Sequence, residues 1–170
     1  MGSPHRYNDA GLGEWNVLEL IAHTNRSHTL LVEYTQESVA PAGSDYNTPE
    51  AIAARARASV AALGADPSAA VAAAARLAQD LVADADADAE LGTPFGRRRL
   101  GDYLPFRVAE LVIHSLDLAR AVELDAAPPP NALRLTLHLI ADMVDKRGAA
   151  ADVVLALAGR TTLPEGFSVY

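Results

Sequence analysis

The chain has 170 residues, half of them hydrophobic, and a formal net charge of −8. Its length suffices for a buried core, and we expect residues 1–170 to form a single domain. The acidic balance argues against a surface for nucleic acid or anionic membranes, and the absence of cysteine excludes disulfides, thiolate metal ligands and a protein thiol nucleophile.

Composition also indicates the fold class. Alanine is abundant and aromatic residues make up 5% of the chain, which favours closely packed helices over a β-sandwich. No apolar run is long enough to span a bilayer, and the N-terminus has no hydrophobic signal segment. We therefore expect a cytoplasmic protein.

The first three predicted elements are helices. Apolar side chains at helical spacing predict a helix over residues 14–38. The tripeptide TPE at 48–50 supplies an N-cap, a proline at the first helical position and an acid in the first turn, so a second helix starts there and ends at Gly64. The dipeptide DP at 66–67 repeats this start signal for a third helix.

An acidic linker and a turn follow the third helix. The aspartates of ADADADAEL, residues 83–91, match the start of a calcium loop, but the sixth position is Ala89 and the twelfth is Phe95, where glycine and glutamate are needed. We therefore expect a solvated linker without calcium. The segment GTPFGRRRLG, residues 92–101, predicts a turn or a short hairpin.

Two more helices complete the predicted core. We expect Asp102 to cap the fourth helix and Pro105 to occupy its first turn. Three consecutive prolines separate this helix from a fifth, over residues 131–147. The tail, residues 148–170, fits a short helix or a short strand. This order predicts an all-α bundle with a helical core over residues 14–147.

The fourth predicted helix carries a polar stripe on an otherwise apolar surface. Arg107, Glu110, His114 and Asp117 recur at intervals of three, four and three residues, which places them on one helix face. Burial of such groups without partners is costly. We therefore expect the stripe to face a cleft or the bundle interior, where its members are paired, hydrated or bound to an ion.

Two members of the stripe suit a metal ion. Glu110 and His114 are four residues apart and can direct a carboxylate oxygen and an imidazole nitrogen at one point, as a divalent transition metal such as zinc requires. The best third candidate is His23, which has apolar neighbours on the first predicted helix. Facing helices of a bundle can bring such ligands together, and three of them leave a position open for water or substrate.

Simpler interpretations of the stripe stay open. A glutamate and a histidine at this spacing are common on helices and often form only a surface hydrogen bond. Arg107 with Glu110 and Asp117 with Arg120 can each form an ordinary salt bridge. On these readings the stripe is a network of ion pairs without a metal.

A two-metal site is a weaker alternative. Glu19 and His23 repeat the four-residue spacing, so two such pairs can build a carboxylate site for two ions. Sites of that kind need further glutamates from other helices, and the second and third predicted helices offer only Glu50. His28 and His138 have no identifiable partner, and we expect them to be structural or exposed.

Three segments together carry a resemblance to a known family. GLGEWNVLELIAHTNR, LGDYLPFRVAELVIHSLDLARAV and the final LALAGR…LPEGFSV resemble the mycothiol-dependent maleylpyruvate isomerase-like group of the DinB/YfiT superfamily. The similarity runs from about Gly11 to the C-terminus. It implies a four-helix bundle, here with an extra C-terminal helix and a short tail. It also implies a divalent metal, usually zinc, held by His23, Glu110 and His114.

The resemblance further implies chemistry with low-molecular-weight thiols, mycothiol in particular. Our hypothesis is a divalent-metal enzyme that uses such a thiol for S-transfer to, or isomerisation of, a small electrophilic substrate; zinc is the first choice, with nickel or cobalt as alternatives. Arg107 and Asp117 are its candidate catalytic residues. Arg107 can orient the Glu110 carboxylate or bind an anionic substrate, and Asp117 can fix the His114 ring. Arg26 is a candidate anion contact for the cofactor.

The alternative hypothesis is a non-catalytic helical bundle that binds a metal or a ligand, or that merely dimerises. Under either hypothesis we expect small-molecule partners and neither nucleic acid nor a membrane, with a homodimer left open. Metal content separates the two hypotheses in part, because a network of ion pairs needs no metal.

Overall fold

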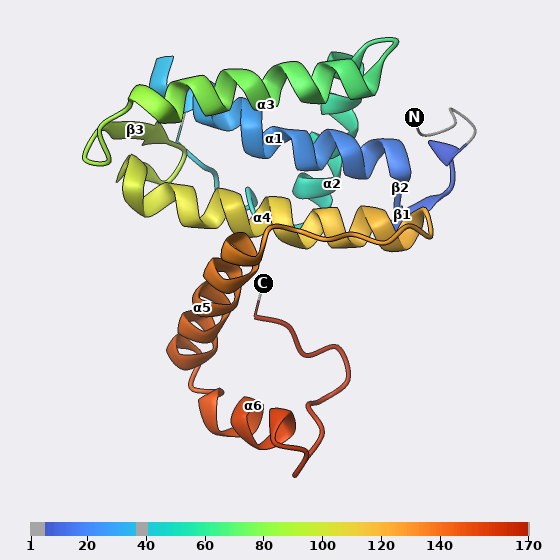
Figure 1. The fold of residues 1–170 in the computed structure, drawn as a ribbon, viewed down its shortest axis with the longest axis vertical. Coiled ribbons are helices and arrows are strands. Elements are labelled where there is room, and N and C mark those ends of the chain that lie inside the picture. Colours follow the sequence, from blue (N-terminus) through green and yellow to red (C-terminus); the bar gives the residue numbers. More distant parts are fainter. Residues whose placement is uncertain (1–5, 37–40, 170) are drawn as a thin grey trace.

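The computed structural model describes residues 6–36 and 41–169 of the chain. In this part the protein is mainly helical with two short antiparallel hairpins, so the all-α prediction is confirmed (Figure 1). The helical elements are α1 (Val17–Gln36), α2 (Pro49–Ser59), the 3-10 turn η2 (Val60–Leu63), α3 (Pro67–Asp84), α4 (Leu100–Ala121), α5 (Pro130–Lys146) and α6 (Ala150–Leu157). The strands are β1 (Ala10–Leu12), β2 (Trp15–Asn16), β3 (Glu90–Thr93) and β4 (Gly96–Arg99).

The first helix starts later than residue 14, where the sequence predicts its start. Trp15 and Asn16 form β2 and pair with β1, and α1 begins at Val17. The Asn16 side-chain oxygen accepts a hydrogen bond from the Glu19 backbone N–H at 2.8 Å, and a Glu19 carboxylate oxygen accepts one from the Asn16 N–H at 3.0 Å. This reciprocal capping determines where the helix begins. The predicted end at residue 38 lies outside the described residues.

The predicted starts of α2 and α3 are confirmed. The Thr48 hydroxyl accepts a hydrogen bond from the Ala51 N–H at 3.3 Å, and the Asp66 carboxylate accepts one from the Ala69 N–H at 3.1 Å. After α2 the turn η2 continues to Gly64, whose φ of 62° suits a residue without a Cβ atom. The predicted stop at Gly64 is therefore also confirmed.

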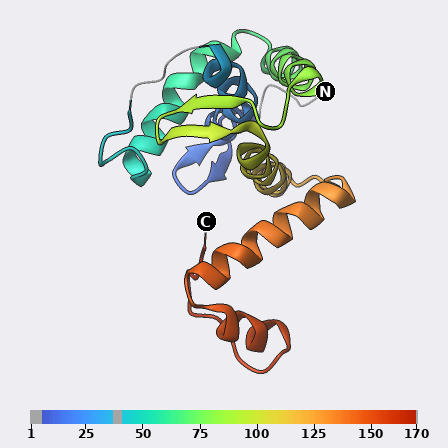
Figure 2. The same ribbon diagram turned by 90° about the vertical axis from the view of Figure 1, so that its left-hand side faces the viewer.

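The predicted hairpin is formed by β3 and β4, whose two antiparallel arrows face the viewer in Figure 2. The prediction that Asp102 caps the next helix is wrong, because β4 runs directly into α4 and Asp102 lies within the first helical turn. Backbone groups replace the side-chain cap. The Leu100 and Gly101 N–H groups donate to the carbonyls of Ala89 and Ala87 in the preceding linker, at 2.8 and 2.9 Å.

Pro105 lies inside α4, beyond the first turn predicted for it, because the helix starts earlier than expected. Proline has no N–H, so the carbonyl four residues before it has no intrahelical donor. The helix nevertheless continues to Ala121.

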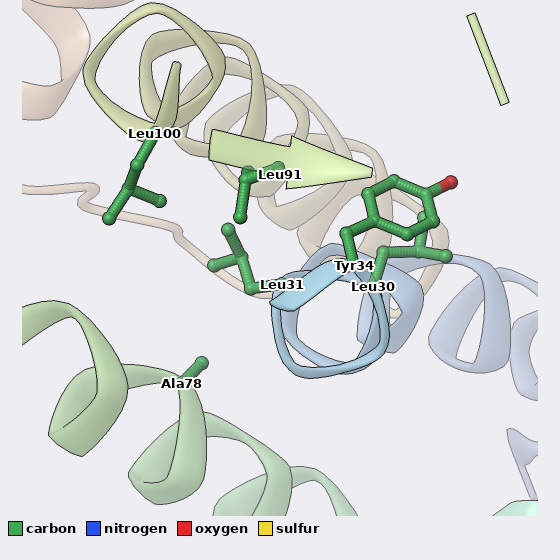
Figure 3. Packing of buried hydrophobic residues seen from close by; sticks show 6 residues of the cluster. All are labelled: Leu30, Leu31, Tyr34, Ala78, Leu91 and Leu100. Carbon is green, nitrogen blue, oxygen red and sulfur yellow. The ribbon is translucent and has the colours of Figure 1, made fainter. Parts of the chain in front are cut away.

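The main hydrophobic cluster holds α1 between α3, β3 and the start of α4. Its buried members are Leu30, Leu31, Tyr34, Ala78, Leu91 and Leu100. Figure 3 shows Leu31 of α1 and Leu91 of β3 pointing toward each other, with Ala78 of α3 on the opposite side of Leu31. This packing places α1 beside α4, the two helices that carry the polar residues discussed below.

The last two helices extend beyond the body formed by α1 to α4, with α5 packed against α4 and α6 in contact with α5. Both views show α5 leading away from α4 and α6 lying beyond it (Figures 1 and 2). The tail therefore begins with a helix rather than a strand, and the Arg147 guanidinium donates to the Ser168 carbonyl at 2.9 Å. Val154 and Leu157 of α6 are 63% and 84% exposed. That residues 1–170 form one domain stays a prediction.

None of the described helices is by itself both long and apolar enough to cross a membrane. The stretches Pro49–Leu63 and Pro67–Asp84 meet the requirement jointly, by length and composition only, and are bent by 100° relative to each other.

Candidate metal centre and its cavity

Three side chains from two helices converge at one point. His23 comes from α1, and Glu110 and His114 come from α4; one ligand atom of each lies within 4.8 Å of the others. The Glu110 Oε2 atom is 3.9 Å from His23 Nε2 and 3.5 Å from His114 Nε2. These are the three residues that the sequence predicts as metal ligands, and the described residues contain no other such group of three.

The donor set and its spacing fit a divalent transition metal. Ligand atoms about 2.0–2.2 Å from one tetrahedral ion lie roughly 3.3–3.6 Å from one another, close to the distances that Glu110 makes to the two imidazoles. Two neutral imidazoles and a carboxylate are ligands that zinc and its neighbours in the series accept. A set of three leaves room for a fourth ligand from solution.

Asp117 orients the second histidine. Its Oδ2 atom lies 3.1 Å from His114 Nδ1, so the carboxylate accepts a hydrogen bond when Nδ1 carries the proton. That tautomer leaves the lone pair of Nε2 directed at Glu110 and the ion position. The sequence allows Asp117 to face either His114 or Arg120, and in the structure it faces His114.

The two histidines have opposite pKa shifts. Burial, reinforced by the charge of His114, lowers the pKa of His23 to about 4. Burial also acts to lower the pKa of His114, but the hydrogen bonds and charges of Glu110 and Asp117 outweigh it and raise that pKa above its ordinary value. At neutral pH His23 is therefore an uncharged imidazole, whereas His114 holds its proton more strongly than an ordinary histidine does.

Aromatic rings enclose the centre on one side. The Trp15 ring lies 4.6 Å from the His23 ring, and the His23 and His114 rings are 4.9 Å apart, edge to face. The Trp15 Nε1 atom is buried and has no hydrogen-bond partner in the described part of the chain. Trp15 is not among the residues predicted for the site. The one sequence feature that could have indicated it is that the chain's single tryptophan stands shortly before His23.

The two predicted arginines lie in the same cavity as the centre. The Arg107 guanidinium carbon is 5.0 Å from the centre of the Tyr103 ring, and its Nε atom is buried without a hydrogen-bond partner among the described residues. Arg26, one turn after His23 on α1, donates to the Ser59 hydroxyl at 3.4 Å. Both side chains can therefore contact a small molecule that binds in the cavity beside His23, Glu110 and His114.

The cavity has a volume of about 920 Å³ and a cationic lining. Its charged side chains are Arg26, Arg55, Arg98, Arg107, Lys146, Asp102 and Glu110. Five positive groups thus face two carboxylates, one of them a candidate metal ligand, in a chain whose net charge is −8. The cavity is therefore suited to an anion, although the protein as a whole is acidic.

The two-metal alternative does not form. The Glu19 carboxylate accepts the Asn16 N–H and lies 3.2 Å from Arg57 Nε, so it is engaged in helix capping and an ion pair. It takes no part in the cluster of three. His138 lines a second, smaller hollow against the start of α4 and is exposed, as expected.

Fold and site together define a class of protein: an all-α bundle with a candidate three-ligand metal centre in the wall of a cationic cavity. The chain belongs to the family of the mycothiol maleylpyruvate isomerase N-terminal domain, whose family model matches residues 8–119. The matched stretch runs from the segment before β1 into the last turn of α4, so it includes His23, Glu110 and His114. No curated protein and no solved structure matches the chain.

Proposed function

We propose that this protein is a divalent-metal enzyme that uses a low-molecular-weight thiol of the mycothiol type. The reaction is S-transfer to a small electrophile or its isomerisation. The observation that carries the proposal is the convergence of His23, Glu110 and His114 in the wall of a cavity large enough for a thiol and a second small molecule. Family membership supports the thiol, and the lack of cysteine means that a thiol must come from solution.

In this proposal His23, Glu110 and His114 hold the ion, and zinc fits them best, with nickel or cobalt as alternatives. When bound, the ion supplies a Lewis acid that lowers the pKa of a thiol at the open position. The protein contributes a neutral His23 and an Asp117 carboxylate that keeps His114 in the ligating tautomer.

Arg107 and Arg26 act on the substrate side. Both guanidinium groups line the cavity beside the three ligands, and the Arg107 Nε and Trp15 Nε1 atoms are buried donors without an acceptor among the described residues. Buried donors of this kind are costly unless a ligand supplies the acceptor. We therefore assign Arg107 and Arg26 to an oxygen-rich, anionic substrate or cofactor group.

The covalent step follows from the chemistry of a thiolate. Its sulfur forms a bond to the electrophilic carbon of the substrate, and a proton from water completes the adduct in S-transfer. In isomerisation the adduct rotates about the bond that was formerly double and then expels the same thiol, which is regenerated. The arginines hold the substrate in place for both outcomes.

The experiment that tests the proposal is metal analysis of the purified protein and of two variants. We expect about one equivalent of zinc or a related metal in the parent and in His138→Ala, and at least a tenfold loss in His114→Ala. His138 is the matched control because it is an exposed histidine outside the cavity. Protein that stays metal-free after incubation with excess zinc would overturn the proposal, and the stripe would then be a network of ion pairs.

A metal-loaded protein is next assayed with mycothiol and a panel of small electrophiles. Turnover that depends on both thiol and metal supports an enzyme. A protein that holds metal but shows no thiol-dependent turnover would be the non-catalytic metal-binding bundle.

A further inference from the structure

The last two helices and the tail form an arm that lies beyond the stretch matched by the family model. We use the name arm for α5, α6 and residues 158–169; the family match ends at residue 119. The arm is folded, since the Arg147 guanidinium donates to the Ser168 carbonyl at 2.9 Å and Val169 is buried. Figures 1 and 2 show it reaching away from the body of α1 to α4. The arm therefore has surface of its own that the body does not cover.

The surface of α6 is apolar on nearly all sides. Its sequence AADVVLAL holds a single charged residue, Asp152, and a helix of this kind is typical of a buried position. None of its residues is buried, and Val154, Leu155 and Leu157 are 63%, 44% and 84% exposed. Isolated exposed apolar side chains are ordinary, but three of them on one short helix form a patch. Such a patch marks a contact surface.

The total surface of the chain is also larger than that of a compact monomer. It measures 10928 Å² for a mass of 17.9 kDa, whereas a compact chain of this mass exposes about 8,000 Å². The difference of roughly 2,900 Å² exceeds the ~800 Å² that each partner buries in a standard interface. The surface that the fold leaves open is therefore sufficient for a stable dimer.

The exposed face of α5 is complementary to itself. Arg134, His138 and Asp142 line one hollow of about 350 Å³ against the start of α4. They are four residues apart, so the arginine and the aspartate flank the histidine at equal distances of about 6 Å along the helix. Arg134 and Asp142 form no ion pair within the described residues. A second α5 that runs antiparallel, with a two-fold axis at His138, places each Arg134 opposite Asp142 of the partner subunit.

An antiparallel pair also brings apolar surfaces together. α6 follows the C-terminal end of α5, and the linker before its N-terminal end, residues 122–129, exposes Leu124 at 69%. In an antiparallel pair the C-terminal end of each helix lies beside the N-terminal end of the other. Each α6 thus comes near the linker of the other chain, where both apolar surfaces leave water.

We propose that the arm is the interface of a homodimer with two-fold symmetry, in which two α5 helices pack antiparallel about His138. Arg134 pairs with Asp142 of the partner subunit, and α6 covers the linker of the other chain. An interface made of two identical faces has to be self-complementary, and the spacing of these charges provides that property. A different protein would need a matching pattern of its own, whereas a second copy already carries it.

The first test is the molecular mass of the full chain in solution, measured by sedimentation equilibrium over a wide range of protein concentration. We expect twice the chain mass of 17.9 kDa. Leu157→Glu should weaken the dimer at least tenfold, because it buries a charge in the apolar patch. Leu77→Glu is the matched control, since Leu77 is 60% exposed on α3 of the body, and it should leave the dimer unchanged.

Charge reversal tests the register of the two helices. Arg134→Glu and Asp142→Arg should each weaken the dimer at least tenfold, because each places like charges opposite one another. The double variant restores opposite charges at both pairs and should recover the affinity of the parent. The two positions are about 12 Å apart along one helix, so this rescue reports a contact between two chains. Arg76→Glu, at an exposed arginine of α3, is the matched control.

Three outcomes would overturn the proposal. They are a chain that stays monomeric at every concentration, a dimer that neither Leu157→Glu nor Arg134→Glu weakens, and a double variant that stays as weak as the single ones. A circular dichroism spectrum checks that each variant is folded, and all the substituted side chains are exposed in the single chain. The interface contains none of the three candidate metal ligands, so the result is independent of the proposed function.

Discussion

Two histidines of one candidate centre differ in what surrounds their rings. His23 is packed against the Trp15 and His114 rings and stays 3.9 Å from Glu110, so burial dominates and its pKa falls to about 4. His114 is closer to Glu110 and also contacts Asp117, so the two carboxylates raise its pKa despite burial. The pair thus provides one imidazole that is neutral near pH 7 and one that would have to give up a proton before it could hold an ion.

This difference predicts the order of protonation in the metal-free protein. As the pH falls, a raised pKa is passed first, so we expect the His114 ring to take up its proton above pH 6.5 and the His23 ring to stay neutral until the pH approaches 4. Zinc affinity should decrease as the pH falls through the His114 transition, because the proton competes with the ion for Nε2. Nuclear magnetic resonance of the imidazole groups measures both transitions.

A matched pair of variants checks the cause. Asp117→Asn removes a charge that raises the pKa of His114, so its transition should move to lower pH, whereas Asp125→Asn, beyond the end of α4, should leave it in place. Coincident titration of both histidines near pH 6.5 would contradict the account of the centre given above.

Spacing on one helix made Glu110 and His114 recognisable as a pair, because side chains four residues apart share a helix face whatever else the chain does. The role of Trp15 was not recognisable. It lies in β2, outside the helical pattern, and reaches His23 only because the first hairpin folds back onto α1.

At the scale of elements, the position of α1 depends on the short hairpin that follows the acidic linker. Leu91 of β3 is fully buried against the Leu30, Leu31 and Tyr34 cluster of α1. Four strand residues therefore contribute to the placement of a helix that carries a candidate ligand. The sequence predicts the hairpin from its turn residues but not this packing, because a buried leucine in a short segment has no periodic pattern around it.

We expect Leu91→Ala to lower the free energy of unfolding by about 3 kcal/mol, since it leaves a cavity in the core cluster. Leu77→Ala is the matched control, because Leu77 lies on α3 with 60% of its surface exposed and should change stability by less than about 0.5 kcal/mol. Urea unfolding followed by circular dichroism compares the two. Similar losses in both variants would mean that β3 does not support the core.

The helix boundaries show which local sequence signals are sufficient to predict where a helix starts. Thr48 and Asp66 start their helices as predicted, because each side chain bonds the backbone three residues later. The start of α4 escaped prediction, since its first N–H groups are satisfied by the carbonyls of Ala87 and Ala89 rather than by a capping side chain. Asp102 is a residue type that often caps a helix, but the carbonyls of the linker already accept the hydrogen bonds of the first N–H groups of α4.

At the scale of the whole molecule, the charge of the cavity lining is opposite in sign to the net charge of the protein. A chain of net charge −8 places five cationic side chains and two carboxylates in the lining of its cavity. The surface charge favours solubility, and the cavity charge selects for anions that reach it. The charge of the cavity cannot be deduced from the net charge of the chain. The net charge is a sum over all residues, whereas the charge of the cavity depends on which side chains the fold brings together.

An ion at the centre would also link two helices. His23 is on α1 and the other two ligands are on α4, so an ion bound to the folded state should stabilise the bundle. At a free zinc concentration of a hundred times the dissociation constant, we expect the free energy of unfolding to rise by about 2.7 kcal/mol. Thermal unfolding with zinc and then with excess chelator measures the gain and its reversal.

His114→Ala should lose this stabilisation, and His138→Ala should keep it. A rise in melting temperature that survives in His114→Ala would show that zinc binds elsewhere. Stabilisation of the parent and of His138→Ala but not of His114→Ala, together with its loss on chelation, would place the ion at His114.

The sequence by itself determined the helical class, the starts of α2 and α3, and the shared face of Glu110, His114 and Asp117. These follow from helix periodicity and from caps that act within a few residues, so distant parts of the chain cannot alter them. Only the tertiary structure decided that His23 faces Glu110, and that Arg57 and Arg97 form ion pairs while Arg55 and Arg98 form none within the described residues. Those properties depend on how separate elements pack, because side-chain burial and ion pairing join residues far apart in sequence.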